Sequence, residues 1–524
     1  MMVGSSLNGK AMPTENPLCL KIGQRVEYMG YFGTLMFVGE VPPTKGIWLG
    51  IDWDDPSRGK HNGTHEGKFY FHTRHMTSGS FVRFGKVNFG HDCAAAIHNR
   101  YGEVKGETAG VDKSNLEILK KNMKAPLFEL VGFDKVNRKQ SQFDKLTVVC
   151  LKEELVNGSG APGELKNLCP RIAELDLSRN LLNSWEVVAE IAQQLTDLWW
   201  LNTSENRLTI PEKPVHLKDS FPKIKHIVAG RMEYTWSEIL SCCSMWPGIQ
   251  TLQVPFNHIT QIGVPPHMLE NLKVLDLEGN CIEDWEEINK IGKLPSLESL
   301  NVCNTGLIEI NFPVEESGNK TELFSSLKQL YLTTNKIQKW ESVSELDKLK
   351  QLEELRFHEN PVLYRENHET SRQLVIARIG RLQKLNGIVI TPVERKGAEY
   401  DYLKKHGQEW IDMNKKENVK ILMENFVLAH PRYPALIEKY GAPEEGEVKC
   451  FSSLLKSQLI SVEIFSPKME GKVYKKKLPL NMSVQKLIGL VQRLYNTGSE
   501  VPYLTYISSK YPDIEAPLEN ARKK

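Results

Sequence analysis

The chain has 524 residues, of which 40% are hydrophobic and 25% charged, and its formal net charge is +2. This length suits roughly three to four domains, and the near-zero charge excludes bulk electrostatic attraction to nucleic acid or anionic membranes. No apolar run approaches the roughly 18 residues that a membrane-spanning helix needs, and residues 1–17 lack the apolar core of a signal peptide. We therefore expect a cytoplasmic protein.

The nine cysteines are scattered singly, apart from the adjacent Cys242 and Cys243, and no C-x-x-C pair occurs. An odd number without paired spacing is typical of reduced thiols and not of a disulfide framework. The cysteines therefore also indicate the reducing cytoplasm.

Residues 18–92 alternate short β-prone runs with glycine and proline. Runs at 24–28, 33–39 and 47–53 predict strands, and the frequent turn signals predict a small antiparallel barrel or sandwich. A glycine-flanked loop, residues 59–63, follows these runs and has aromatic residues on both sides in the sequence. Such a loop suits binding of the carboxylated end of an acidic peptide that carries a terminal aromatic residue.

The residue types around this loop explain that expectation. Lys60 can pair with carboxylates, and glycines 59 and 63 leave room for backbone N–H groups to approach a peptide. Aromatic side chains can form the walls of a pocket for the terminal ring, and an arginine can hold a carboxylate. The candidate tail-binding residues are Trp48, Lys60, His61, Asn62, Gly63, Phe71, Phe81 and Arg83.

The module resembles the CAP-Gly domain across its whole length. The resemblance rests on a series of motifs: 23–26, 33–34, 38–39, G-x-W-x-G at 46–50, the 59–63 loop, Tyr70-Phe71, and G-x-F-V-R at 79–83. It implies binding of C-terminal Glu-Glu-Tyr or Glu-Glu-Phe tails, as on α-tubulin and end-binding proteins.

The loop departs from the family's usual Gly-Lys-Asn-Asp-Gly, because His61 replaces the Asn and Asn62 replaces the Asp. The departure removes one negative charge, which does not weaken binding of an acidic ligand. His61 is either an exposed loop residue or a residue whose protonation affects binding. His61 and His65, or His72 and His75, would suit zinc only on a helix, and the glycines argue against one. We expect no metal and no cofactor.

From 140 to 362 the chain repeats the pattern L-x-x-L-x-L-x-x-N, which is typical of leucine-rich repeats. The positions equivalent to the Asn are 180, 206, 232, 257, 280, 305, 335 and 360, spaced by 23 to 30 residues. Such repeats stack into a solenoid because none can bury its apolar face alone. The recurrent Asn is expected to satisfy backbone groups, and the Trp residues that follow it are expected to pack in the convex core.

Several positions between the repeat leucines are expected to be exposed on the concave side of the solenoid. Any solenoid exposes such residues, so the indication of a binding face is weak. The candidate residues of this face are Trp200, Asp276, Tyr331, Arg356 and His358.

Residues 363–405 resemble the C-terminal cap of SDS22-like leucine-rich repeats, and residues 406–456 are expected to form helical sequence followed by a proline-containing linker. Within this region we expect residues 391–428 to be mostly helical, with a stop at His430-Pro431. Pro431, Pro434 and Pro443 indicate a linker around residues 438–445. Residues 457–524 have the order strand, strand, helix from Ser483, strand, and resemble a ubiquitin-like domain. Its final strand is missing from the sequence, so we expect an incomplete domain with exposed apolar surface. The overall class is therefore a multidomain chain with an all-β CAP-Gly module, an α/β solenoid and an α+β C-terminal segment.

We expect no enzyme activity. Residues 158–163 match G-x-G-x-x-G, but a dinucleotide-binding fingerprint needs a helix that opens directly from the loop, and Pro162 and the repeat register favour a loop between repeats. No Walker A, G-x-S-x-G or H-E-x-x-H pattern is present.

The order of the three parts resembles the cofactor E family of tubulin-folding chaperones. The resemblance implies a chaperone of α-tubulin in assembly and disassembly of the α/β heterodimer, with folding cofactors B, C and D and a small GTPase as partners, in the cytoplasm and at the cytoskeleton. Two alternatives stay open: a CAP-Gly adaptor on microtubules, although no sustained heptads appear, and a leucine-rich-repeat regulatory subunit of an enzyme such as a phosphatase.

Overall fold

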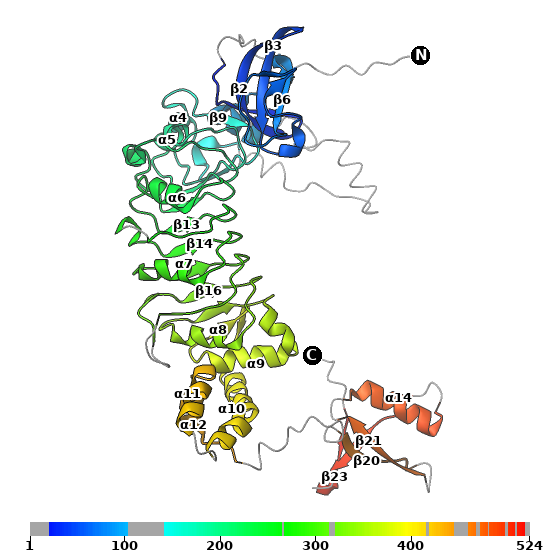
Figure 1. Cartoon of the computed structure of the whole chain (residues 1–524). Coiled ribbons are helices and arrows are strands. Elements are labelled where there is room, and N and C mark those ends of the chain that lie inside the picture. Colours follow the sequence, from blue (N-terminus) through cyan, green and yellow to red (C-terminus); the bar gives the residue numbers. More distant parts are fainter. Residues whose placement is uncertain are drawn as a thin grey trace, which may run out of the picture. The chain divides into compact units, whose positions relative to one another are not determined.

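The fold is known from a computed structural model (Figure 1). It describes residues 20–102, 141–264, 267–313, 320–414, 419–444, 459–467, 472–479, 482–497, 501–508 and 511–518. The chain divides into two compact units, one made of Met1–Glu399 and Glu424–Pro434 and the other of Tyr400–Met423 and Ala435–Lys524.

The N-terminal module is built on a four-stranded antiparallel sheet with the order β1-β2-β3-β6. The strands are β1 (Arg25–Tyr28), β2 (Tyr31–Val41), β3 (Thr44–Trp53) and β6 (Gly79–Arg83), so the three predicted strands are confirmed. The short strands β4 (Thr64–His65) and β5 (Lys68–Phe69) pair with each other, and the 3-10 turns η2 (Pro56–Arg58) and η3 (Phe84–Lys86) complete the module.

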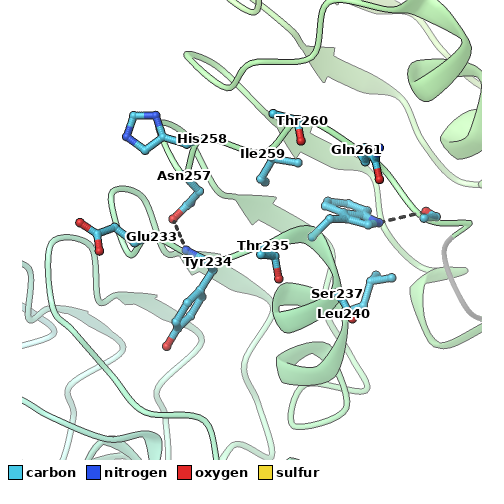
Figure 2. A pocket seen from close by; sticks show the side chains of 12 residues that line it. Glu233, Tyr234, Thr235, Ser237, Leu240, Asn257, His258, Ile259, Thr260 and Gln261 are labelled. Atoms are coloured by element: carbon cyan, nitrogen blue, oxygen red, sulfur yellow. Dashed lines mark hydrogen bonds between the residues drawn. The ribbon is translucent and has the colours of Figure 1, made fainter. Parts of the chain in front are cut away.

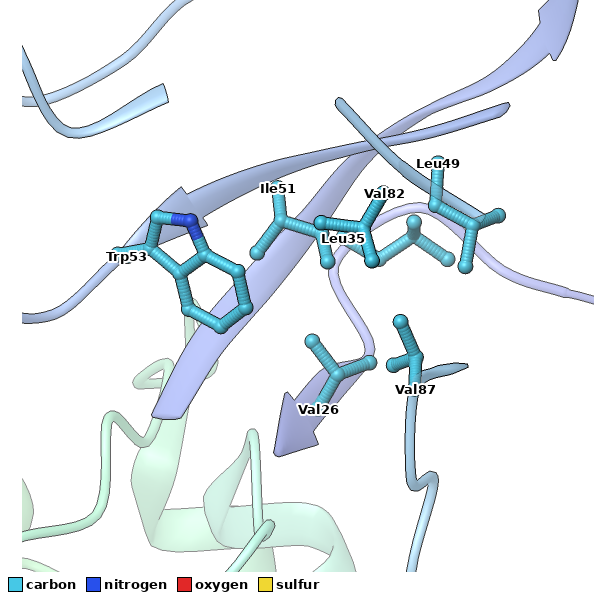
Figure 3. Packing of buried hydrophobic residues seen from close by; sticks show 7 residues of the cluster. All are labelled: Val26, Leu35, Leu49, Ile51, Trp53, Val82 and Val87. Carbon is cyan, nitrogen blue, oxygen red and sulfur yellow. The ribbon is translucent and has the colours of Figure 1, made fainter. Parts of the chain in front are cut away.

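Alternation along the strands separates a core face from a second face of this sheet. In β3, Leu49, Ile51 and Trp53 point into the core, whereas Trp48 and Gly50 lie on the other face. The seven buried residues of the core are drawn in Figure 3: Val26, Leu35, Leu49, Ile51, Trp53, Val82 and Val87. Burial of each large apolar side chain contributes about 2 kcal/mol before entropy is counted.

The segment after this sheet packs on the first turn of the solenoid. Strand β7 (His91–Asp92) pairs in parallel with β9 (Val156–Gly158), and helix α1 (Cys93–Tyr101) follows it. The Asp92 side chain caps α1 by accepting from the Ala95 N–H at 2.8 Å. The Tyr101 hydroxyl accepts from the Cys150 N–H at 2.8 Å and donates to the Cys150 carbonyl at 3.2 Å. No pattern in the sequence indicated this packing.

The solenoid carries an eleven-stranded sheet that runs in sequence order from β8 to β19, with β9 outside it. Neighbouring strands from β8 to β18 are parallel and β19 is antiparallel. The strands are β8 (Val148–Cys150), β10 (Glu174–Asp176), β11 (Trp200–Asn202), β12 (His226–Val228), β13 (Thr251–Gln253), β14 (Val274–Asp276), β15 (Ser299–Asn301), β16 (Gln329–Tyr331), β17 (Glu354–Arg356), β18 (Lys384–Leu385) and β19 (Ile388–Val389). The predicted leucine-rich repeats are confirmed.

The repeated asparagines form a buried ladder, as predicted. The Asn257 amide donates to the carbonyls of Ala229 and Val254 at 2.9 and 3.0 Å. Its oxygen accepts from the N–H groups of Met232 and Tyr234 at 2.9 and 3.3 Å. Each such side chain therefore satisfies backbone groups that would otherwise be buried without partners. The asparagines of the ladder are 180, 206, 257, 280, 335 and 360.

Short helices follow the strands along one side of the solenoid (Figure 1). Four of them begin at a tryptophan: α5 (Trp185–Ala192), α6 (Trp236–Cys243), α7 (Trp285–Asn289) and α8 (Trp340–Glu345). Trp185, Trp236 and Trp285 are buried, which confirms their packing role, whereas Trp340 is half-buried with the Arg378 guanidinium 5.4 Å from its centroid. The 3-10 turns are η4 (Phe143–Lys145), η5 (Pro214–Ser220), η6 (His267–Leu269), η7 (Lys290–Lys293), η8 (Leu346–Lys348) and η9 (Pro361–Arg365).

The G-x-G-x-x-G stretch lies in a loop of the first repeat, but a helix does open from it. Helix α4 (Glu164–Leu168) begins directly after Gly163, contrary to our expectation. The helix has five residues, and Glu164 accepts from the loop N–H of Ala161 at 3.0 Å. The repeat accounts for this loop and helix without a nucleotide.

Helix α9 (His368–Arg378) follows the last repeat, and α10 (Pro392–Asn414), α11 (Val419–Ala429) and α12 (Tyr433–Tyr440) come next. The predicted helical stretch and its end before His430-Pro431 are confirmed. The linker expected around residues 438–445 is partly wrong, because α12 covers its first three residues. Pro434 lies in the first turn of that helix, where a missing N–H costs little.

The C-terminal segment contains the predicted hairpin of β20 (Leu459–Phe465) and β21 (Val473–Pro479). Helix α14 (Val484–Tyr495) follows, with Ser483 as its N-cap, as predicted. Strand β22 (Thr505–Ser508) pairs with β23 (Tyr511–Pro517), which the sequence analysis did not predict. Ile460, Phe465 and Val473 are exposed on the first hairpin. Among the helices of the described residues, none is long and apolar enough to cross a bilayer.

Candidate peptide-binding site

Aromatic side chains from separate segments meet around Phe81 on the second face of the N-terminal sheet. The Phe81 centroid lies 5.4 Å from that of Phe71 and 5.1 Å from that of His61. Phe37 and Tyr70 also belong to the group, with centroids 6.1 and 5.3 Å from Phe81. We call these five residues the aromatic cluster, and the His65 ring borders it with its centroid 6.1 Å from that of Phe81. The three Phe and Tyr rings meet Phe81 edge to face, a favourable arrangement for aromatic pairs.

The loop of residues 59–63 is anchored on β6. The N–H groups of Lys60 and His61 donate to the Gly79 carbonyl at 2.8 and 3.2 Å, and the Gly79 N–H donates to the His61 carbonyl at 2.7 Å. A β-carbon at Gly63, whose φ is +87°, would lie 1.7 Å from the Phe71 carbonyl oxygen. The glycine is therefore required for packing of the loop on its own module, a reason that is independent of a ligand.

The His61 ring is part of the site and not a freely exposed side chain. Its Nδ1 accepts from the Gly63 N–H at 3.0 Å, so the neutral ring carries its proton on Nε2. Burial lowers the pKa of His61, and the nearby His65 lowers it further. The neutral form therefore prevails at neutral pH, and it presents an N–H donor.

Lys60 stands beside this group with an exposed side chain and makes no ion pair with any described residue. Asn62 is half-buried next to it. An exposed ammonium without an ion-pair partner among the described residues can attract a carboxylate without first breaking an internal ion pair.

Trp48 and Arg83 form the neighbouring part of the same face, as paired residues of β3 and β6. The Arg83 guanidinium carbon lies 3.8 Å from the Trp48 ring centroid, and its Nη1 donates to the Lys45 carbonyl at 2.9 Å. A cation–π contact thus holds Arg83 against the indole of Trp48. Only some of the guanidinium N–H groups remain available to a carboxylate.

These features agree with comparisons of the sequence with known proteins. The sequence model of the CAP-Gly domain matches residues 22–87. The chain is also 44% identical to Tubulin-specific chaperone E of Bos taurus over 504 residues, which cover 95% of this chain and 94% of that protein. The chain belongs to the tubulin-specific chaperone E family.

Other members of the tubulin-specific chaperone E family show the same extent of similarity. The Xenopus laevis protein is 42% identical, with 95% of both chains covered. The Homo sapiens protein is 41% identical, with 96% of this chain and 95% of that protein covered. Among solved structures, a leucine-rich-repeat protein of Leptospira interrogans matches 47% of this chain and 62% of its own at 18% identity and a TM-score of 0.31.

In this member of the tubulin-specific chaperone E family, the expected repeat face does not form one cluster. Tyr331 and Arg356 lie side by side on β16 and β17, with the guanidinium carbon 4.8 Å from the ring centroid. Trp200 lies far along the sheet on β11, where its ring is 5.7 Å from that of His226. His358 is exposed just after β17.

Asp276 has a structural task of its own. Its carboxylate accepts from the Glu278 N–H at 2.9 Å, and burial raises its pKa. Asp176 and Asn202 accept from the N–H two residues later in the same way, at 2.8 and 3.0 Å. This position therefore closes the turn after the strand in several repeats, which weakens the case for Asp276 as a contact residue.

A hollow of 590 Å³ lies on the solenoid beside α6 (Figure 2). It forms where a repeat lacks a convex helix: the described residues between β13 and β14 contain only the turn η6. The Trp236 Nε1 donates to the Gly263 carbonyl at 2.9 Å on its wall. None of the candidate site residues predicted from the sequence lines it, although the repeat residue Asn257 does. The lining residues are Glu233, Tyr234, Thr235, Trp236, Ser237, Leu240, Asn257, His258, Ile259, Thr260, Gln261 and Gly263.

Proposed function

We propose that this chain is a tubulin-folding chaperone that binds α-tubulin in two places. The acidic C-terminal tail binds at Lys60 and the aromatic cluster, and the folded body binds on the solenoid. The observation that carries the proposal is the exposed, unpaired Lys60 beside the rings around Phe81. The family's name supports tubulin as the client.

The tail site supplies two complementary contacts. Lys60 attracts the carboxylates of the tail, while the ring edges around Phe81 receive its terminal aromatic side chain. The His61 Nε2–H adds a donor for a carboxylate oxygen in place of the amide usual in CAP-Gly loops. Trp48, Phe71 and Arg83 border the site, and Asn62 and Gly63 shape the loop.

Both binding sites lie on one chain, so once one site has bound the client, the other site meets the client at a high effective concentration. Separation or assembly of the α/β heterodimer then requires only that this chain bind the free and the paired subunit with different affinities. No covalent chemistry and no cofactor are needed. Folding cofactors B, C and D and a small GTPase are the proposed partners, in the cytoplasm and at the cytoskeleton.

Titration calorimetry with a peptide that ends in Glu-Glu-Tyr tests the tail site. The full-length chain should bind it, and Lys60→Ala should weaken binding about tenfold, which corresponds to about 1.4 kcal/mol. Lys21→Ala, at another exposed lysine of the same module, should bind as the unchanged protein does. Equal binding by Lys60→Ala, or equal binding of a peptide without the Tyr, would contradict the proposal.

A further inference from the structure

The N-terminal module touches the solenoid at two separate places. The first follows the chain directly: β7 pairs with β9, and α1 packs on the same repeat. The second lies far away in the sequence, where Asp54 of the module meets Arg207 of the solenoid, with the Arg207 Nε donating to the Asp54 Oδ1 at 2.9 Å. One contact alone would permit rotation, whereas two fix an orientation.

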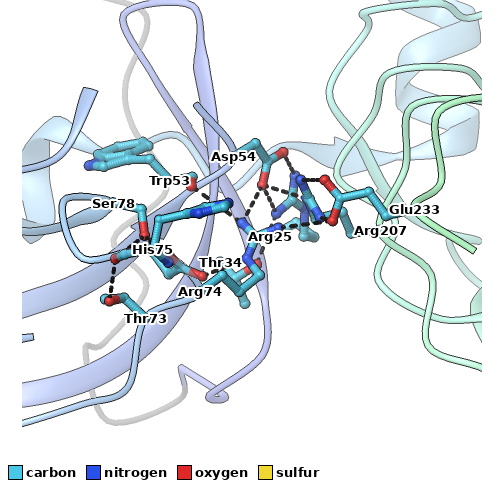
Figure 4. Close-up of polar contacts among 11 residues, drawn as sticks. Arg25, Thr34, Trp53, Asp54, Thr73, Arg74, His75, Ser78, Arg207 and Glu233 are labelled. Carbon is cyan, nitrogen blue, oxygen red and sulfur yellow. Dashed lines mark hydrogen bonds and ion pairs between the residues drawn. The ribbon is translucent and has the colours of Figure 1, made fainter. Parts of the chain in front are cut away.

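Asp54 is the common acceptor of this second contact, as Figure 4 shows. Arg25 and Arg74 of its own module donate to the same Asp54 Oδ1 at 2.8 and 3.1 Å. Burial alone would raise the pKa of Asp54, but the three arginines outweigh it and the pKa lies below its usual value. The carboxylate is therefore ionised across the neutral range.

Glu233 of the next repeat extends the contact. The Arg207 Nη2 donates to its Oε1 at 2.6 Å, so one guanidinium bridges two carboxylates. Arg74 reaches Glu233 from the module, with Nη1 3.7 Å from Oε2, and its Nε donates to Asp52 at 2.7 Å. Three arginines and three carboxylates thus balance, and charges arranged in such networks are held better than isolated surface pairs.

The surroundings of the network favour a lasting contact. The side chains of Arg25, Asp54 and Arg207 are only 1%, 26% and 22% exposed, so water screens them less than a surface pair. Glu233 is 54% exposed and forms the outer end of the network. Two further contacts join the module to the solenoid: the Asn183 amide donates to the Gly23 carbonyl at 3.3 Å, and the Arg179 guanidinium carbon lies 5.6 Å from the Phe32 centroid in a cation–π contact.

We propose that Arg207 and Glu233 form a latch that holds the N-terminal module in one orientation on the solenoid, with the β7–β9 pairing as the hinge. The tail site and the solenoid sheet then face a client at a set spacing. The partner that fits is one protein that carries an acidic, aromatic-ended tail on a folded body. This consequence for the client rests on the proposed function, whereas the latch itself does not.

The latch can be tested in the full-length chain by electron–electron distance measurements. Spin labels on non-natural residues at Met76 and Val215, exposed by 76% and 45%, report on the module and the solenoid without touching native thiols. Arg207→Ala removes the bridge but leaves Asp54 with Arg25 and Arg74, so the module keeps its internal ion pairs. Lys223→Ala is the matched control, because it removes an exposed solenoid pair with Asp197 at 2.8 Å.

The unchanged protein and Lys223→Ala should each give one narrow distance distribution. Arg207→Ala should broaden it at least twofold. A broad distribution in the unchanged protein, an unaltered narrow one in Arg207→Ala, or equal broadening in the control would each overturn the latch.

The functional arm uses the same variants with the Glu-Glu-Tyr peptide and with whole α-tubulin. Arg207→Ala should bind the peptide normally and α-tubulin about tenfold more weakly, because the second contact loses effective concentration. If Arg207→Ala broadens the distance distribution but binds α-tubulin as tightly as the unchanged protein does, the latch does not affect client binding, and this part of the proposal is refuted. Absence of peptide binding in every variant would refute the proposed function and leave the distance result standing.

Discussion

The Phe71 ring packs so closely on Gly50 that a β-carbon at position 50 would lie 2.4 Å from the Phe71 Cε1. Phe71 is buried, and Gly50 lies opposite Phe81 in the sheet. Gly50 therefore makes room for the aromatic cluster on this face of β3.

Gly50→Ala should displace Phe71 and destabilise the N-terminal module by about 2 kcal/mol, the usual cost of overpacking. Thermal unfolding followed by the near-ultraviolet signal measures this loss. Gly85→Ala is the control, since a β-carbon there meets nothing within 4 Å. Equal unfolding temperatures of the two variants would show that Phe71 can move away without cost.

Phe81→Ala and Lys60→Ala should have different effects on the stability of the N-terminal module and on its affinity for the peptide. Phe81 is half-buried and contacts four other rings of the cluster, so its truncation should cost about 2 kcal/mol of stability as well as peptide affinity. Lys60 is exposed, so its loss should weaken peptide binding only. Calorimetric binding and denaturant unfolding on both variants check this, and a destabilised Lys60→Ala would contradict it.

Asn257→Ala should destabilise the solenoid by about 3 kcal/mol. The change leaves two buried N–H groups and two carbonyls without the partner that Asn257 supplies. Chemical denaturation measures the change, and Asn167→Ala on the exposed face of α4 is the control. A loss below 1 kcal/mol would mean that water replaces the amide.

His430 should make stability depend on pH below neutrality. Burial lowers the pKa of His430 to about 4, and the nearby Arg378 adds to the effect. Between pH 6.5 and 4 the unfolded chain binds a proton at this residue and the folded chain does not, so acid favours unfolding. The free energy of unfolding should fall by about 3 kcal/mol over that range.

Denaturant unfolding at pH 7 and pH 4.5 checks the contribution of His430. His430→Gln cannot titrate, so its stability should fall less between the two values than that of the unchanged protein. Parallel pH profiles of the two proteins would show that other groups cause the dependence.

Periodic patterns made most of the fold predictable. The β-prone run at residues 47–53 and the repeat of Leu and Asn are both local patterns that predict their own elements. Helix α12 was missed because three prolines at 431, 434 and 443 indicate a linker, although the first turn of a helix tolerates proline at 434. Strand β7 and helix α1 were missed because β7 pairs with the distant strand β9 of the solenoid. A local sequence pattern cannot indicate such a long-range pairing.

The candidate site was predictable in part, because the residue types around the 59–63 loop indicate a peptide-binding surface. The structure brings Phe71 and Phe81 together, while their binding role stays a prediction. Phe37 was missed because the register of β2 and β3, shifted by a bulge, places it opposite Gly50. Arg207 and Asp54 are 153 positions apart, and no motif connects them.

The most direct test of the two-site account is the affinity of the full-length chain for intact α-tubulin and for α-tubulin without its terminal Tyr and Glu residues. The account predicts that removal of these residues weakens binding about tenfold and that Lys60→Ala lowers the affinity for intact α-tubulin to the same level. It also predicts that Lys60→Ala no longer distinguishes the two forms. Equal affinity of the unchanged chain for both forms would contradict the account.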